Sequence, residues 1–171
     1  MIPRKTENAP EHTLTATAKP TRDIAAAHEL ATEQAIGFQM IGQFVSEFSQ
    51  LDFTIRFLLA NRLGLPEEYF DIVTAPYDFL MLCNVTQVLL CKQSPDKKEA
   101  IKKLFDDCRK LNDDRVHVAH GMWTLGREGP VARHVPRSSL HAKFFFEQKD
   151  KLRQLAAEAQ RLMRQILTIG K

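Results

Sequence analysis

Apolar residues recur at three- and four-residue spacing along the stretch that begins at Asp23, which predicts a long amphipathic helix with one buried stripe. The stripe comprises Phe38, Ile41, Phe44, Phe48, Leu51, Ile55, Leu58 and Leu59. Gly64 and Pro66 are typical of a helix end, and Pro66 also begins a short helix that Pro76 ends. The sequence therefore predicts a long helix followed by a short one.

Residues 78–92 are apolar on nearly every side, so we expect a central helix that the other helices enclose. Ser94 and Pro95 then form a cap followed by a first-turn proline, which predicts the start of another helix. Its single apolar stripe consists of Ile101, Leu104, Phe105, Cys108 and Leu111. Gly121 is a natural stop for this helix.

The apolar period changes to two between residues 122 and 146, which predicts a small antiparallel hairpin or three-stranded ribbon. Helical spacing returns from Leu152 to Ile166, in a last helix that closes at Gly170. Residues 1–22 have three prolines and almost no large apolar side chain, so we expect a disordered N-terminal tail.

The expected fold class is accordingly all-α. Residues 23–171 are predicted to form one domain, an antiparallel bundle of four to five helices that carries the ribbon of residues 122–146 as an insertion. No apolar run reaches the roughly 18 residues that a membrane span needs, and the first residues lack the apolar stretch of a signal peptide. The three cysteines form no CxxC pair, which favours a reducing compartment. We expect a cytoplasmic protein without membrane association.

Charge is unevenly distributed along the chain. Residues 23–120 carry ten basic and fifteen acidic side chains, a net charge of −5, whereas residues 121–171 carry ten basic and four acidic side chains, a net charge of +6. A basic C-terminal third beside an acidic body would attract a polyanion or a second copy of the chain. A solvated charged face explains the same distribution, so charge alone does not decide the function.

The common signatures for binding phosphates, dinucleotides or catalytic zinc, and the hydrolase elbow, are absent from the sequence. What remains is a polar cluster at the end of the predicted fourth long helix. It comprises Asn112, Asp113, Asp114, Arg115, His117 and His120. Helical geometry places Asp113, His117 and His120 on one stripe, and Asn112 and Arg115 on another.

Arg115 and His120 are five residues apart, hence about 140° around the helix and about 7.5 Å along its axis. Two side chains in that relation converge on one phosphate more easily when two copies of the helix face each other. The spacing therefore favours a composite groove with two-fold symmetry.

The segment RVHVAH, from Arg115 to His120, is similar to the Arg, four residues, His motif of the HEPN-domain superfamily. The surrounding LNDDRVHVAHGMW resembles the fourth helix of that superfamily, with its AHG exit followed by an aromatic residue. The earlier segment FVSEFSQLDFTIRFLLANRLGL is similar to the first HEPN helix. The resemblance covers about 140 residues.

This resemblance implies a dimeric helical bundle that acts as a metal-independent endoribonuclease in a toxin, phage-defence or RNA-processing system. It implies Arg115 and His120 as catalytic residues, an RNA substrate, no cofactor, no metal, and an antitoxin protein as a partner. Histidine has an ordinary pKa near 6.5 and exchanges protons at neutral pH, while arginine binds phosphate bidentately. The family usually has a polar residue after the arginine, where this chain has Val116, so we expect His117 or Asn112 to replace it, with Asp113 as a further supporting group.

Alternative interpretations of the same residues stay open. Arg115 and His120 could simply stabilise the helix end, because histidine near a helix C-terminus interacts favourably with the helix dipole. Asp113, His117 and His120 are a feasible set of metal ligands, although no fourth ligand is evident. A catalytically inactive, dimeric binding module for a partner protein or a nucleic acid is the principal alternative function, and Val116 is its best support.

The predicted ribbon has its own charge. Four basic residues, Arg127, Arg133, Arg137 and Lys143, stand against the single acidic residue Glu128, a net charge of +3. Basic side chains in such an arrangement contribute sequence-independent, salt-sensitive affinity for RNA. The ribbon is therefore either a row of basic side chains that binds RNA phosphates, here called the phosphate rail, or an ordinary solvated hairpin at the end of the bundle.

Overall fold

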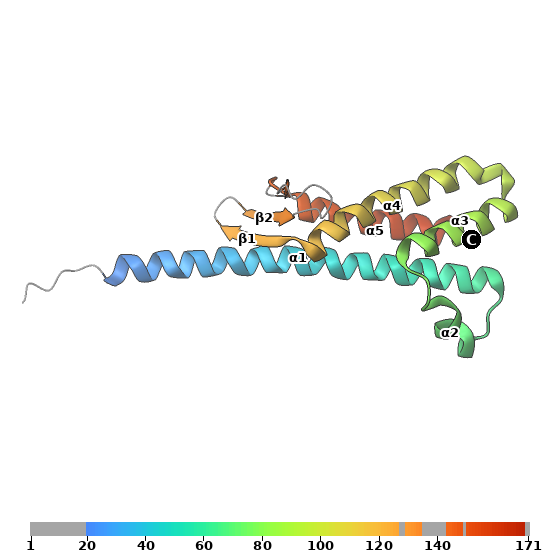
Figure 1. Ribbon diagram of the computed structural model, residues 1–171, viewed down its shortest axis with the longest axis horizontal. Helices are drawn as coiled ribbons and strands as arrows, with labels where there is room; N and C mark the ends of the chain where they lie inside the picture. The colour runs from blue at the N-terminus through green and yellow to red at the C-terminus, as the bar shows by residue number, and fades with distance from the viewer. Residues whose placement is uncertain (1–19, 127–128, 135–142, 149, 170–171) are drawn as a thin grey trace, which may run out of the picture.

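The computed structural model describes residues 20–126, 129–134, 143–148 and 150–169. Four long helices and a small sheet make up most of the described chain (Figure 1). The elements are α1 (Pro20–Leu63), the 3-10 turn η1 (Glu67–Tyr69), α2 (Phe70–Thr74), α3 (Phe79–Gln93), the 3-10 turn η2 (Pro95–Lys97), α4 (Lys98–His120), β1 (Met122–Gly126), β2 (Gly129–His134), β3 (Lys143–Phe145) and α5 (Lys151–Ile169). The prediction of a helical bundle with a small β insertion is confirmed, and apart from the start of α1 the helices begin and end close to the predicted residues.

The N-terminal boundary differs from the prediction. Helix α1 begins at Pro20, inside the segment 1–22 that was predicted to be disordered, and residues 1–19 of that segment lie outside the described residues. Proline is favoured at the first position of a helix because its missing N–H is not needed there. The predicted stop of α5 at Gly170 also lies outside the described residues, and the helix ends at Ile169.

The helices are not all antiparallel. The Glu47 carboxylate of α1 accepts a hydrogen bond from Gln160 of α5, and Arg62 of α1 donates one to the carbonyl of Ile169, so the two helices run in the same direction. Phe48 packs against Phe79 at the start of α3, which shows that α3 also begins level with the middle of α1. Only α4 runs against the other three long helices.

The segment between α1 and α3 explains this parallel arrangement. After α1 ends at Leu63, η1 and α2 lead the chain back alongside α1, and α3 starts there (Figure 1). Arg56 of α1 fixes this return, because its guanidinium donates hydrogen bonds to the backbone carbonyls of Thr74 and Tyr77. A long-range contact of this kind leaves no periodic signal in the sequence.

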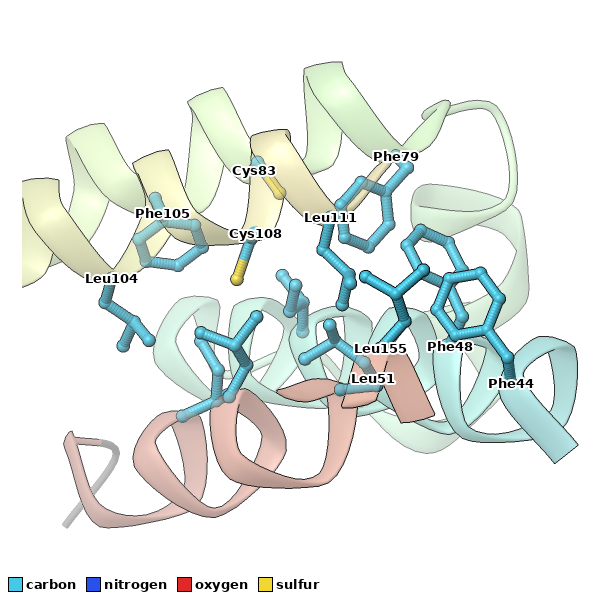
Figure 2. Close-up of a cluster of buried hydrophobic side chains, with 14 of the residues drawn as sticks. Phe44, Phe48, Leu51, Phe79, Cys83, Leu104, Phe105, Cys108, Leu111 and Leu155 are labelled. Atoms are coloured by element: carbon cyan, nitrogen blue, oxygen red, sulfur yellow. The ribbon is translucent and has the colours of Figure 1, made fainter. Parts of the chain in front are cut away.

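A single cluster of buried side chains joins all four long helices (Figure 2). Ala132 of β2 extends it to the sheet. Phe44, Leu51 and Ile55 supply it from α1, and the predicted stripes of α4 and α5 are buried within it. Phe38, which was predicted to belong to the buried stripe of α1, is instead exposed. The free thiols of Cys83 and Cys108 meet between α3 and α4, and their hydrogen bond raises the pKa of the Cys108 thiol. These two cysteines are therefore packing residues and not nucleophiles.

Helix α3 is not the enclosed central helix that its composition predicted. It packs mainly against α1 and α4 in the described part of the chain, and Leu80, Met81 and Val88 on its outer side are exposed. Among the described helices, none is by itself long and apolar enough to cross a membrane. Two consecutive segments, Glu67–Thr74 and Phe79–Gln93, reach the length and hydropathy of a membrane span only when they are counted together, and they are bent by 120° relative to each other.

The sheet is antiparallel, with the strand order β1-β2-β3. Trp123 pairs with Ala132, and Ala132 with Phe145, so these three residues face the helices. Leu125 of β1 packs directly on Gly37 of α1, where a Cβ atom would lie 2.8 Å from a Leu125 methyl carbon. Any side chain at position 37 would therefore displace the Leu125 side chain from α1.

Gly121 ends α4 as predicted, for a reason of packing. Its φ of −74° is open to any residue, but a Cβ atom there would lie 2.6 Å from the His117 carbonyl oxygen and 2.9 Å from the Cβ of Ala132. Glycine thus lets β2 pass close to the end of α4. The C-terminal end of α4, where the predicted functional residues lie, contacts the ribbon through His117 and α1 through Arg115.

Candidate functional site

The structure divides the predicted site residues between two surfaces. Asn112 and Arg115 line a pocket that α4 forms with α1 and the start of α3. His117 faces the ribbon, and His120 is exposed at the last position of α4. Asp113 is also exposed. The helical stripe that links Asn112 to Arg115 is confirmed, and His120 is not among the described residues that line the Arg115 pocket.

The pocket has a volume of about 560 Å³. Polar groups and apolar walls both contribute to its lining, which consists of Phe48, Ser49, Asp52, Arg56, Asp78, Phe79, Leu80, Asn112, Arg115 and Val116. Three separate helices therefore build it, and the return segment that Arg56 fixes sets their relative positions.

Arg56 and Asp52 form the most constrained part of the pocket. The Arg56 guanidinium binds both carboxylate oxygens of Asp52, at 2.6 and 3.2 Å, besides the two backbone carbonyls of the return segment. Because the pair is half-buried and Arg56 has its donors engaged, the two charges neutralise each other. Arg56 is a structural residue of the pocket and has little capacity left for a ligand.

Asp78 caps the N-terminus of α3. Its Oδ1 atom accepts a hydrogen bond of 2.7 Å from the backbone N–H of Met81, as an N-cap residue does. Within the described chain, no side chain or backbone donor binds its Oδ2 atom, and the residue is exposed. Asp78 therefore presents one free carboxylate oxygen at the pocket.

Asn112 is the buried polar residue of the pocket. Its side chain is 9% exposed, and no described residue forms a hydrogen bond with its amide. The residue is largely buried, but its amide atoms are not among the buried polar atoms that lack a partner, so solvent reaches them through the pocket. An uncommitted donor and acceptor at the wall of a pocket is typical of a ligand-binding site.

Arg115 lies at the rim of the same pocket. The carbon at the centre of its guanidinium is 5.9 Å from the centre of the Phe48 ring, a cation–π contact that orients the side chain. The described residues offer its N–H groups no hydrogen-bond acceptor. Arg115 is therefore exposed, positively charged and free to bind an anion.

His117 has a packing role that the sequence did not indicate. Its ring stacks on Phe145 of β3, with centroids 3.9 Å apart and planes at 21°. Trp123 is also a packing residue, since its indole N–H donates to the Val118 carbonyl and its ring stacks on Phe146. The His117–Phe145 stack and the hydrogen bond from Trp123 to Val118 attach the ribbon to the last turns of α4.

The metal-binding alternative finds no support in the described part of the chain. No group of three or more His, Cys, Asp or Glu side chains there is arranged to hold a metal ion. Asp113, His117 and His120 share a stripe in sequence, but His117 is engaged with Phe145. Nearby, burial raises the pKa of the Asp114 carboxyl above its ordinary value.

The predicted RNA-binding residues of the ribbon are described only in part. Arg133 of β2 and Lys143 of β3 are exposed, as a phosphate rail requires. Arg133 pairs with Met122 and with Phe144, which are also exposed, so it stands on the outer face of the sheet. Arg127 and Arg137 lie outside the described residues.

Sequence reasoning missed Asp52, Arg56 and Asp78 as members of the pocket. Two local signals were present: an acid and a base at the i, i+4 spacing of a helical ion pair, and an aspartate directly before an apolar helix. Neither signal says that the two features meet in space. That meeting depends on the return of the chain after α1.

Comparisons with protein-family models, with curated proteins and with solved structures find no match to this chain. The resemblance to the HEPN superfamily therefore stays a prediction.

Proposed function

We propose that this protein is a HEPN-like, metal-independent endoribonuclease that acts as a homodimer in the cytoplasm. The observation that carries the proposal is the Arg115 pocket: a free guanidinium at the rim, and at the wall the Asn112 amide, which has no hydrogen-bond partner among the described residues. Arginine is the side chain best suited to bind a phosphodiester bidentately and to stabilise the extra negative charge of its transition state.

His120 is the proton-transfer group of this proposal. It accepts the proton of a ribose 2′-hydroxyl, whose oxygen attacks the adjacent phosphorus while the bond to the 5′-oxygen breaks. The partner subunit's His120 donates a proton to the departing 5′-oxygen, and the products are a 2′,3′-cyclic phosphate and a 5′-hydroxyl end. No external oxidant, reductant or metal is required.

A second copy is needed because His120 does not line the pocket of Arg115 in the described part of the same chain. The outer face of α1 supports such pairing. Phe38 and Phe53 are 64% and 57% exposed, Val45 lies between them, and exposed Gly42 leaves open space for a close approach. Ser49, on the same face, lines the pocket, so a copy that packs on this face would also cover the pocket rim.

Cleavage of single-stranded RNA in excess EDTA tests the enzymatic proposal. We expect the wild-type protein to cut the RNA and both Arg115→Ala and His120→Ala to lose at least about a hundredfold in rate, as expected when a general acid–base group or an electrostatic contact is removed. His28→Ala is the matched control, because His28 is an exposed histidine on the far part of α1. Equal rates for His120→Ala and the control would contradict the assignment.

Light scattering tests the homodimer independently of cleavage. We expect a dimer at micromolar concentration, and Val45→Glu should convert it to a monomer because a buried unpaired carboxylate is costly. Val88→Glu is the matched control, since Val88 is an exposed apolar residue of α3 away from the outer face of α1. A wild-type monomer, or a Val45→Glu dimer, would refute pairing through this face.

A catalytically inactive binding module is the second candidate. The exposed Val116 next to Arg115, together with the separation of Arg115 from His120, favours it. In that case RNA stays intact in the cleavage assay, while Arg115→Ala still weakens RNA binding. The proposal also includes an antitoxin protein as a partner, and co-purification of a small protein expressed from a neighbouring gene tests that part.

A further inference from the structure

The pocket behind Arg115 has a different chemistry from its rim. Asp52 and Arg56 neutralise each other, so the charges that remain are those of Asp78 and Arg115, one of each sign. A site that binds only phosphate through arginine would have an excess of positive charge and few carboxylates. The interior therefore suits a ligand that is uncharged but polar, connected to an anion at the rim.

The walls of the pocket are suited to a flat, apolar ring. Phe48 and Phe79 lie at the back, with ring centres 4.6 Å apart. Leu80 and Val116 line the pocket with side chains that are 43% and 36% exposed, unusually accessible for apolar groups at a concave surface. Burial of these side chains against an aromatic ring would remove apolar surface from water.

The free polar groups define which ring fits. The Asn112 amide offers one donor and one acceptor side by side, and neither has a partner among the described residues. The free Oδ2 atom of Asp78 can only accept a hydrogen bond. A ligand that satisfies the Asn112 amide must carry a hydrogen-bond acceptor beside an amino or imino N–H donor. To satisfy Asp78 as well, it must carry a further N–H that donates to the carboxylate.

We propose that this pocket is a nucleobase subsite that holds a base with an exocyclic amino group, while Arg115 binds the phosphate of the same nucleotide. Asn112 is the base-reading residue, in the bidentate manner that asparagine uses with adenine, and Asp78 accepts from the amino group. Uracil fits poorly because it has a single N–H and presents its two carbonyl oxygens to a carboxylate. The inference rests on the proposed function, for which it names the recognised part of the RNA.

Equilibrium binding of nucleoside monophosphates to the full-length protein tests the subsite without relying on cleavage. Isothermal titration with AMP, CMP, GMP and UMP measures base preference, and ribose 5-phosphate shows what the phosphate contributes alone. We expect AMP, CMP and GMP to bind about tenfold more tightly than UMP, and ribose 5-phosphate to bind no better than UMP, since one bidentate contact discriminates by about that factor. Ribose 5-phosphate binding as tightly as AMP would overturn the proposal.

The decisive variant is Asn112→Leu, which has nearly the same volume but no amide. We expect it to lose about tenfold in affinity for AMP and to abolish the preference over UMP, while the urea midpoint of the fold stays the same or increases. Asn84→Leu is the matched control, because the Asn84 amide lies on α3 outside the pocket and binds Arg109. Unchanged preference in a folded Asn112→Leu protein would refute the role of Asn112.

The two levels of the proposal fail in different ways. If RNA stays intact but AMP binds with the expected preference, the subsite is supported and the nuclease activity is refuted. If RNA is cut while the four nucleotides bind equally well, the nuclease is supported and the subsite is refuted. A second variant, Asn112→Gln, keeps the amide but displaces it by one methylene, and we expect it to retain a base preference with reduced affinity.

Discussion

Replacement of Arg56 by methionine tests how the pocket is held together. Methionine keeps an unbranched apolar side chain of similar reach but removes every donor. The side chain of Arg56 is only 18% exposed, and the substitution deprives the Thr74 and Tyr77 carbonyls of a charged donor and leaves Asp52 without its partner. We expect a marked loss of stability, because the return segment between α1 and α3 loses its link to α1.

The magnitude follows from the number of bonds. Hydrogen bonds to a charged group contribute about 1.5–3 kcal/mol each, and the lower end applies here because the site borders a pocket that water can enter. The two carbonyl bonds together therefore contribute about 3 kcal/mol. For a protein of this size that corresponds to a decrease in Tm of about 6–12 °C, and to a urea midpoint lower by about 1–2 M at an unchanged m-value.

Urea unfolding followed by circular dichroism is the assay, with Arg153→Gln as the control. Arg153 also pairs with an aspartate, Asp150, but both side chains are more than half exposed, so we expect a loss of no more than about 1 kcal/mol. A double variant with Asp52→Asn should recover part of the loss, because it removes the unpaired carboxylate. If Arg56→Met and Arg153→Gln unfold at the same urea concentration, the reasoning about the return segment is wrong.

Three further predictions concern other parts of the molecule. Gly37→Val should push Leu125 away from α1 and destabilise the fold by about 1–3 kcal/mol, with a change in the fluorescence of the single tryptophan. Asp114→Asn should stabilise the fold at pH 7 but not below about pH 3.5. Burial raises the pKa of the Asp114 carboxyl, so its charged form opposes folding. The stability of the wild type therefore decreases as the pH rises from the carboxyl's ordinary pKa to its raised pKa in the folded state. Arg133→Glu combined with Lys143→Glu should weaken RNA binding and flatten its salt dependence without loss of helical signal; an unchanged salt slope would make the ribbon a structural element only.

Amphipathic helices were the part of the fold that the sequence predicted best. Helix α4 has apolar residues on one side only, and from Ile101 to Leu111 its stripe is buried as expected. An apolar sequence without a polar side is less informative, because it fits both an enclosed helix and one with an open face. Helix α3 is a helix with an open face, on which Val88 is exposed. The sequence does not show this, because it follows from the packing of α3 mainly against two neighbouring helices.

The candidate site was predictable only within one helix. Helical geometry correctly grouped Asn112 with Arg115, because that relation depends on rotation per residue alone. The stacking of His117 on Phe145 depends on how the ribbon folds back, and Asp78 reaches the pocket because Arg56 directs the chain. Contacts between distant segments of this kind have no local pattern from which they could be inferred.

The first half of α1 has a further consequence for the dynamics of the molecule. Helix α1 has 44 residues, about 66 Å of helix, and its N-terminal part extends beyond the ribbon (Figure 1). Between residues 24 and 36 every side chain is exposed except Glu33, which is half-buried, so these turns have backbone hydrogen bonds but little tertiary packing. Their amide protons should therefore exchange with solvent through local opening of single turns, whereas from Met40 onward, where burial begins, exchange requires the bundle itself to unfold. One continuous helix would thus contain two regimes of hydrogen exchange, with the boundary close to Gly37.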